Sequence, residues 1–105
     1  MITHTMLVSF DQPLPESELD QYLGDIKEAM LNTGLTESFE ARRHLPVPGE
    51  EEVPALIATV LVQIAVADLE TLGKAFAAPE LHTVIDKWKG RHSYRVAFAN
   101  HESIA

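Results

Sequence analysis

The stretch ALIATVLVQIAVA, Ala55 to Ala67, carries no charged residue and no glycine. Read with the two-residue period of a β-strand, neither of its sides is strongly polar. One side has Leu56, Ala58, Val60, Val62, Ile64 and Val66, and the other has Ala55, Ile57, Thr59, Leu61, Gln63, Ala65 and Ala67. A strand with two such sides belongs in the centre of a sheet that is covered on both faces. The rest of the chain supplies helices for only one covering layer, so we expect a second copy of the chain to supply the other.

Changes in hydrophobic period define the other elements. Alternating residues predict further strands over Ile2–Phe10, Leu35–Leu45 and His92–Ala99. Apolar residues three and four apart predict a helix from about Glu16 to Gly34. The same spacing predicts a second helix from Asp68 to Gly90, with Leu69, Leu72 and Phe76 on its apolar stripe before Pro79 interrupts it.

Particular residues are expected to begin and end these elements. Ser17 with Asp20 three residues later resembles a capping box, and Asp68 is placed to cap the second helix. Gly34 suits the left-handed conformation that follows a helix. The segment Pro46–Pro54, with three prolines and three glutamates, is predicted to be a mobile acidic loop.

The resulting order is βαββαβ with a broken second helix. At 105 residues, the whole chain from 1 to 105 is predicted to form a single domain. Right-handed crossovers predict a split βαβ arrangement. In that arrangement the strands at 2–10 and 55–67 lie parallel to each other in the centre, those at 35–45 and 92–99 lie at the edges, and the helices cover one face.

The other face of the sheet is predicted to be a two-fold interface in a homodimer. Its central residues are uncharged, whereas solvated sheet faces usually carry Lys and Glu at their centre. Leaving large apolar side chains there in water would forgo about 1.5–3 kcal/mol of burial for each. The predicted interface residues are Thr3, Thr5, Leu7, Ile57, Thr59, Leu61 and Gln63. The alternative is the solvated face of a monomer.

Composition limits the classes of partner and compartment. Sixteen acidic against eight basic residues give a formal charge of −8, which repels nucleic acids and anionic membrane surfaces. The chain has no cysteine, which excludes disulfides and thiolate metal sites. The first residues do not resemble a signal peptide, and the uncharged stretch is too short to span a membrane. These features predict a cytoplasmic protein.

Three segments carry a resemblance to a known family. They are the opening MITHTMLVSF, the segment TESFEARRHL and the segment FAAPELHTVIDKW, in which a proline is closely followed by a histidine. Over nearly the whole chain the sequence resembles the dimeric α+β barrel proteins, in particular the stress-responsive A/B barrel type. The resemblance implies an α+β, ferredoxin-like fold with a four-stranded antiparallel sheet and a two-helix layer on one face. Isomerases, monooxygenases, polyketide cyclases, haem proteins and members of unassigned role share that fold.

Two histidines are the candidate catalytic groups. His4 lies on the apolar face of the first strand, where it should point between sheet and helices, and it matches the first-strand histidine of the resembling family. If the segment with His82 packs over this strand, both imidazoles would face one pocket and could act as acid and base. The predicted pocket residues are Tyr22, Met30, Phe39, Trp88, Tyr94 and Phe98. Cyclase-type members carry histidines just before and two residues after the proline, where this chain has Ala78 and Leu81.

The sequence leaves three functions open. The first is a homodimer that binds a small apolar or aromatic molecule between sheet and helices. The second is a small cofactor-independent enzyme of cyclase, isomerase or monooxygenase type. The third is a non-catalytic structural dimer in which His4 is a hydrogen-bonded core residue and Tyr22, Met30 and Trp88 fill the space. No histidine pair has the spacing of a known metal site and no cofactor motif is found, so neither a metal nor a cofactor is predicted.

Overall fold

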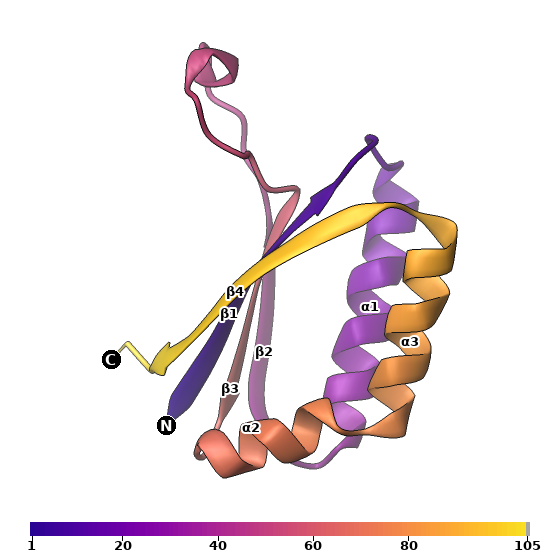
Figure 1. The fold of residues 1–105 in the computed structure, drawn as a ribbon, viewed down its shortest axis with the longest axis vertical. Helices are drawn as coiled ribbons and strands as arrows, with labels where there is room; N and C mark the ends of the chain where they lie inside the picture. The colour runs from indigo at the N-terminus through magenta and orange to yellow at the C-terminus, as the bar shows by residue number, and fades with distance from the viewer. Residues whose placement is uncertain (105) are drawn as a thin grey trace.

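A computed structural model describes residues 1–104 of the chain. Its elements follow the predicted order, with two helices before the last strand (Figure 1). They are β1 (Ile2–Phe10), α1 (Glu16–Asn32), β2 (Thr36–Arg43), the short 3-10 helix η1 (Glu50–Glu52), β3 (Val60–Val66), α2 (Leu69–Phe76), α3 (Pro79–Arg91) and β4 (Tyr94–Glu102). Gly90 lies inside α3 rather than after it, and β4 extends three residues beyond the predicted strand.

The four strands form one antiparallel sheet in the order β2-β3-β1-β4. The central position of β1 and β3 and the edge position of β2 and β4 are as predicted, but the predicted parallel pairing of the central strands is wrong. Met6 of β1 lies opposite Val62 of β3 in an antiparallel register. The crossover through α1 makes β2 run in the direction of β1, and β3 then returns between them in the opposite direction.

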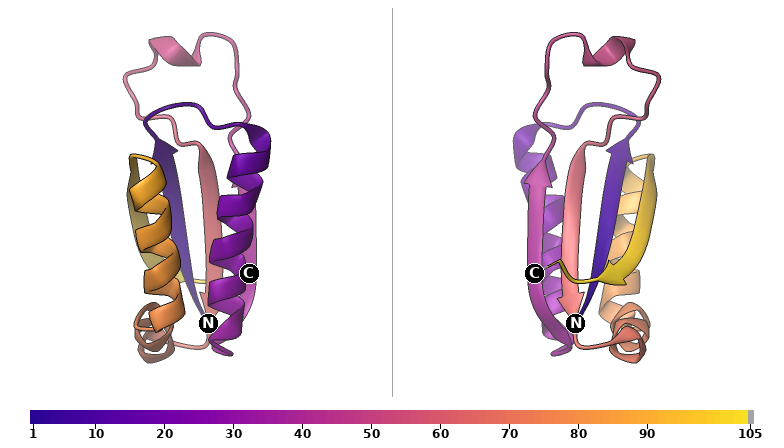
Figure 2. Two further views of the ribbon diagram at one scale, coloured as in Figure 1. Left: turned by 90° about the vertical axis from the view of Figure 1, so that its right-hand side faces the viewer. Right: turned by 90° about the vertical axis from the view of Figure 1, so that its left-hand side faces the viewer.

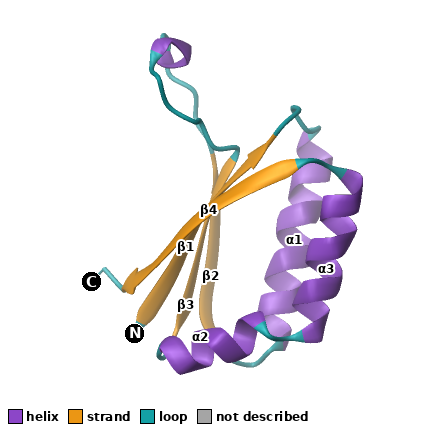
Figure 3. Ribbon diagram, in the orientation of Figure 1, coloured by secondary structure: helices purple, strands orange, loops and turns teal. Residues whose placement is uncertain are grey.

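The helices lie on one side of the sheet only (Figures 1 and 3). Helices α1 and α3 run beside each other over that face, and α2 crosses its lower end (Figure 2). No helix or strand of residues 1–104 covers the opposite face (Figures 1 and 2). The described part of a single chain therefore covers one face of the sheet only, as the sequence predicted.

The central strand β3 is shorter than the predicted strand. It begins at Val60, and the stretch from Ala55 to Thr59 belongs to the preceding loop. Val60 pairs with Val8 of β1 and with Arg43, the last residue of β2. Beyond Val60 the regular ladder with β1 stops although β1 continues to Phe10: the Thr59 N–H donates to the Val8 carbonyl oxygen at 2.8 Å, and the Thr59 hydroxyl, rather than a backbone carbonyl, accepts from the N–H of Phe10. Two uncharged sides thus did not make a strand where β2 no longer continued beside it.

The ends of the helices follow the sequence in part. Asp68 caps α2 as predicted, because its carboxylate accepts a hydrogen bond from the N–H of Thr71 at 2.8 Å. Gly34 has a φ of 72°, in the left-handed region predicted for it. No capping box forms at Ser17, because the residue that precedes α1 is Pro15 and no side chain caps that helix. Leu69, predicted on the apolar stripe of α2, is exposed.

The acidic loop after β2 contains a fixed turn. Glu50 accepts a hydrogen bond from the N–H of Val47 at 2.5 Å, and its other carboxylate oxygen lies 2.6 Å from Nε2 of His44. These contacts hold the pKa of Glu50 below its ordinary value. The loop projects from the end of the sheet (Figure 1), and the contacts of Glu50 fix the turn within it.

The core lies between the sheet and the helices. Its fully buried side chains include Val8, Val60, Val62, Ile64, Val66, Met30 and Trp88. The alternate residues of β3 are buried against the helices, as its period predicted. The indole Nε1 of Trp88 donates a hydrogen bond to Oδ2 of Asp25 at 3.0 Å, which joins α3 to α1.

Candidate functional site

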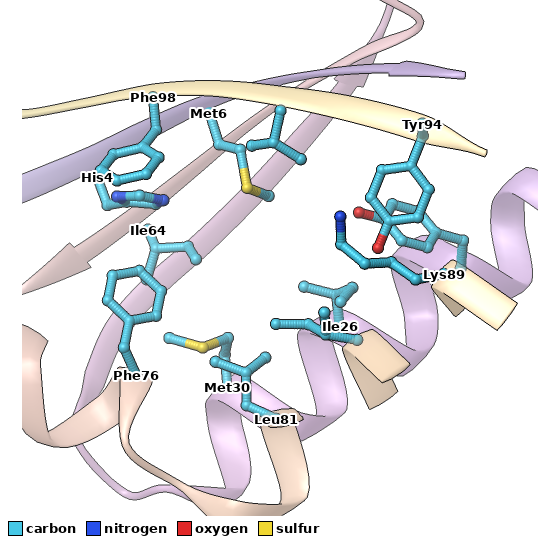
Figure 4. A pocket seen from close by; sticks show the side chains of 13 residues that line it. His4, Met6, Ile26, Met30, Ile64, Phe76, Leu81, Lys89, Tyr94 and Phe98 are labelled. Carbon is cyan, nitrogen blue, oxygen red and sulfur yellow. The ribbon is translucent and has the colours of Figure 1, made fainter. Parts of the chain in front are cut away.

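A cavity of about 330 Å³ lies between the sheet and the helices, on the side of β1 and β4. Strand β4 runs obliquely away from the helical layer (Figure 1), and Phe98 of β4 on the pocket wall is exposed. The thirteen residues that line it come from two strands of this side, from β3 and from all three α-helices (Figure 4): His4, Met6, Tyr22, Ile26, Met30, Ile64, Phe76, Leu81, Ile85, Lys89, Tyr94, Val96 and Phe98. We call this cavity the His4 pocket.

His4 occupies one end of the pocket, as Figure 4 shows. Its ring is only 2 % exposed and lies between two phenyl rings, with centroids 4.7 Å from that of Phe76 and 4.8 Å from that of Phe98. Phe98 is itself 64 % exposed, because no helix covers this part of β4. Strand alternation directs His4 to the helical side and Phe76, at the end of α2, closes over it.

The hydrogen bonding of His4 defines which nitrogen is available. Its Nδ1 donates to Oδ1 of Asn100, on the neighbouring strand, at 2.7 Å. The described residues offer Nε2 no hydrogen-bond partner. Burial lowers the pKa of His4, while the bond to Asn100 opposes that shift. At neutral pH the imidazole is thus uncharged, with the proton on Nδ1 and a free lone pair on Nε2.

The other end of the pocket is lined by Tyr22, Tyr94 and Lys89 (Figure 4). The two phenol rings are 5.8 Å apart and are both buried. Burial raises the pKa of Tyr22, so its phenol stays protonated at any ordinary pH. Nζ of Lys89 lies 4.8 Å from the centre of the Tyr94 ring. This end therefore offers hydroxyl groups and one cation, while the walls between the two ends are apolar.

The second predicted catalytic residue, His82, does not face the pocket. Its side chain is exposed, and Nε2 donates to the carbonyl oxygen of Phe76 at 2.7 Å. That carbonyl lies at the C-terminus of α2, where the helix leaves acceptors without partners. The break at Pro79 brings His82 beside that terminus, so its function is to cap α2, and the prediction of two imidazoles in one pocket is wrong.

Four of the six predicted pocket residues lie on the pocket wall, namely Tyr22, Met30, Tyr94 and Phe98. Phe39 does not, because β2 is at the edge of the sheet opposite β4 and its side chain lies near Leu23 of α1. Trp88 does not either, because its ring turns toward α1 and contacts Tyr22 of that helix. The ring also stacks on His92, the residue that follows α3. Tyr22 and Met30 are buried, yet they leave the cavity beside them unfilled.

Sequence reasoning missed eight of the thirteen lining residues and also Asn100, and three of these missed residues bear on the chemistry of the site. Asn100 was overlooked because the last strand was predicted to end at Ala99, one residue before it. Phe76 was assigned to the core only. Lys89 was not considered, although the spacing of Lys87, Lys89 and Arg91 shows that one cation of α3 must face away from the other two.

The open face of the sheet carries the predicted interface residues that belong to strands. Leu7 lies opposite Leu61 on one side and Ala97 on the other, while Thr5 lies opposite Gln63 and Ala99. Thr3 is buried by the C-terminal segment, where its hydroxyl lies 2.7 Å from that of Ser103. Ile57 and Thr59 precede β3, so they do not belong to the central part of this face.

Polar groups at the centre of the open face satisfy one another. The hydroxyl of Thr5 lies 2.6 Å from Nε2 of His101 and accepts a hydrogen bond from the amide of Gln63 at 3.2 Å. Charged residues such as Glu40, Arg42 and Arg95 lie on the edge strands. The centre of the face is thus uncharged and internally hydrogen-bonded.

In the chain from Met1 to Ile104, no three side chains of the metal-binding types lie close enough together to hold an ion. None of the helices in the same residues has both the length and the hydrophobicity needed to cross a bilayer.

Known proteins resemble this chain in fold rather than in sequence. No family model matches it, and no curated protein matches it either. A dabb family protein with a ferredoxin-like fold from Mesorhizobium loti superposes with a TM-score of 0.76 at 13 % identity, over 99 % of this chain and 97 % of that one. A dimeric protein of unknown function from Bacteroides fragilis, also ferredoxin-like, gives 0.68 at 14 % identity, over 97 % and 95 %.

Two of the similar structures are described as enzymes, a hydroxynitrile lyase and a cofactor-independent oxygenase from Streptomyces nogalater. The hydroxynitrile lyase of Passiflora edulis superposes with a TM-score of 0.75 at 12 % identity, over 95 % of this chain and 90 % of the lyase. Identities this low concern the fold alone. For the fold, the resemblance to dimeric α+β barrel proteins that the sequence suggested is confirmed, including the four-stranded antiparallel sheet and the helical layer on one face.

Proposed function

We propose that this protein binds a small, largely apolar and aromatic molecule in the His4 pocket. The observation that carries the proposal is the pocket itself: a cavity of about 330 Å³ with apolar walls and with one lone pair, that of His4 Nε2, lacking a partner. Ligand sites commonly combine apolar walls with a few polar groups that fix orientation. A structural dimer module would have filled this space with Tyr22, Met30 and Trp88.

The same proposal includes a homodimer that pairs through the open sheet face. The central part of this face is uncharged, and Leu7 remains 43 % exposed there in the single chain. Several structures with this fold are described as dimeric, which supports the pairing. A two-fold arrangement would place the same uncharged strands of both copies together.

Binding is tested with 2-naphthol as a probe, by isothermal titration calorimetry and by the change in probe fluorescence. Ile85 lines the pocket, and Ile85→Phe should fill part of it and abolish or strongly weaken binding. Thr83→Phe adds a ring on the exposed side of the same helix and should bind as the wild type does. Equal affinity in both variants, or no binding to the wild type, would refute the proposal.

A second candidate function is general-base catalysis by His4. The observation that favours it is the neutral imidazole, whose free Nε2 lies at the end of an apolar cavity and whose pKa is lowered by burial. His4 is the one candidate base rather than one of two, because His82 caps α2 and does not face the pocket. Such a base would act alone at its end of the pocket, because Tyr22 and Tyr94 lie at the other end, where burial raises the pKa of both phenols.

The base is tested with 5-nitrobenzisoxazole, an aromatic substrate that opens when a base removes its ring proton. The wild type should accelerate the opening, and His4→Gln should reduce the rate to that of the Ile85→Phe variant. The rate of the wild type should fall as the pH drops below the lowered pKa of His4. A rate that is unchanged by His4→Gln would leave ligand binding without catalysis.

A further inference from the structure

The cations of α3 fall into two groups with different surroundings. Nζ of Lys87 lies 3.0 Å from Oδ2 of Asp25, and Arg91 lies 2.5 Å from Oε1 of Glu18. These two basic residues are four positions apart, so they share the side of α3 that faces α1. Lys89 lies between them in sequence. It is rotated by about 200° from each of them around the helix axis, which directs it to the pocket.

Lys89 is left without an acidic partner. No carboxylate of residues 1–104 forms a salt bridge with its ammonium group, which lies over the Tyr94 ring at the end of the His4 pocket (Figure 4). Within residues 1–104, Lys27 and Arg95 also form no salt bridge, but the two neighbouring cations of the same helix are both paired, so Lys89 is the cation of α3 that is available to an anion. The exposed ammonium group borders the apolar cavity on one side, so water screens its attraction for a ligand anion in the cavity only in part.

The two ends of the pocket therefore differ in polarity. The Lys89 end favours a negative charge, whereas Nε2 of His4 at the opposite end accepts a hydrogen bond. A single lysine with no arginine on the pocket wall suits a group with one negative charge. The strongly negative chain would repel a ligand that carried several.

We propose that the ligand class of the His4 pocket is an aromatic hydroxycarboxylic acid, with its carboxylate at Lys89 and its hydroxyl donating to His4. This inference rests on the proposed binding function and specifies the chemistry of the ligand. The apolar middle of the pocket, formed by Met6, Ile26 and Ile85, takes the ring system. Phenols without the acid group bind less tightly, and so do aromatic acids without the hydroxyl.

The test compares 6-hydroxy-2-naphthoate with 2-naphthoate and with neutral 2-naphthol, by calorimetry at low salt. The wild type should bind 6-hydroxy-2-naphthoate most tightly. Lys89→Gln should weaken both acids by about 5- to 10-fold, the effect of losing one partly exposed charge-assisted contact, and should leave 2-naphthol unchanged. Lys74→Gln removes the same charge from the exposed side of α2 and should change the affinity for the acids less than about 2-fold.

The hydroxyl end is tested separately. The advantage of 6-hydroxy-2-naphthoate over 2-naphthoate should disappear in His4→Phe, whose folding is checked by circular dichroism. The wild-type comparison of the two acids stands on its own if that variant does not fold, because equal affinities would already refute the hydroxyl contact.

The outcomes also separate this inference from the binding function on which it rests. If 2-naphthol binds but the acids show no preference that depends on Lys89, the ligand class is wrong while the binding function holds. If none of the three probes binds, both are wrong. An equal loss of acid binding in Lys74→Gln and Lys89→Gln would mean that only the overall charge matters, which refutes the contact.

Discussion

The substitution Leu7→Lys tests the pairing of two copies through the open sheet face. Leu7 lies at the uncharged centre of this face, opposite Leu61 and Ala97, and 43 % of its surface is exposed in the single chain. Complete burial of a leucine contributes about 1.5–3 kcal/mol, so covering the exposed part contributes about 0.6–1.3 kcal/mol in each copy. Both copies supply this residue to a two-fold interface, which gives about 1.3–2.6 kcal/mol per dimer.

That free energy corresponds to about a 10- to 80-fold change in the dimer dissociation constant. The lysine adds a further penalty, because its ammonium group would lose water at the interface and would approach its symmetry mate. We therefore expect Leu7→Lys to be monomeric at concentrations where the wild type is a dimer, with little change in the stability of the single chain. Sedimentation velocity over a range of concentrations measures both proteins.

The control is Leu69→Lys, which makes the same chemical change at an exposed leucine on α2, away from the open face. It should sediment as the wild type does. Two results would refute the reasoning: a wild type that is a well-folded monomer at high micromolar concentration, or a Leu7→Lys variant whose dimer is as tight as that of Leu69→Lys.

Four other substitutions test local features of one chain, each by urea denaturation. Asp25→Asn should destabilise the protein at neutral pH, because the carboxylate accepts a hydrogen bond from Trp88 and the pKa of Asp25 is lowered chiefly by its contact with Lys87. A carboxyl group with a lowered pKa in the folded state stabilises the fold at pH values above its ordinary pKa. The difference in stability between variant and wild type should therefore disappear as the pH falls below about 4. Gly34→Ala should cost about 1 kcal/mol because of the positive φ, whereas Gly24→Ala, inside α1 with open space around the added methyl, should stabilise by about 0.5–1 kcal/mol. Asp68→Ala should cost about 1 kcal/mol through loss of the cap on α2, and equal stability of variant and wild type would show that this cap contributes nothing.

Most of the fold could be predicted because local periodicity matches the secondary structure. The alternation of Ile2–Phe10 and the three-and-four spacing after Glu16 correspond to β1 and α1. The antiparallel direction of β1 and β3 follows from the order of the elements: the crossover through α1 makes β1 and β2 parallel, and the connection without a crossover helix makes β3 antiparallel to both. The handedness of the crossovers determines the positions of the strands.

Strand ends depend on partners that are distant in sequence. Ala55–Thr59 has the composition of a strand, but β2 ends at Arg43, opposite Val60, and the ladder with β1 stops at Val8, so those residues leave the sheet. Asn100 shows the opposite case, since pairing with β1 carries β4 past the predicted end at Ala99. The composition of a segment therefore shows neither where β3 begins nor where β4 ends.

The part of the site that could be predicted is the part that depends on strand alternation alone. His4 on the apolar side of β1 had to point toward the helices. The place of His82 depended on the angle at Pro79 between α2 and α3, which one sequence does not specify. Phe39 and Trp88 were assigned by their apolar character, but the sheet order and the contact with Asp25 place them elsewhere.

The alternation along β1 gives this strand two functions at once. His4 and Met6 reach the cavity from one side, while Thr5 and Leu7 form the centre of the open face on the other. A shift of the strand that improves the fit on one side must move the residues on the other by the same amount. Occupancy of the cavity and self-association should therefore be thermodynamically linked, and each should alter the equilibrium constant of the other by the same factor.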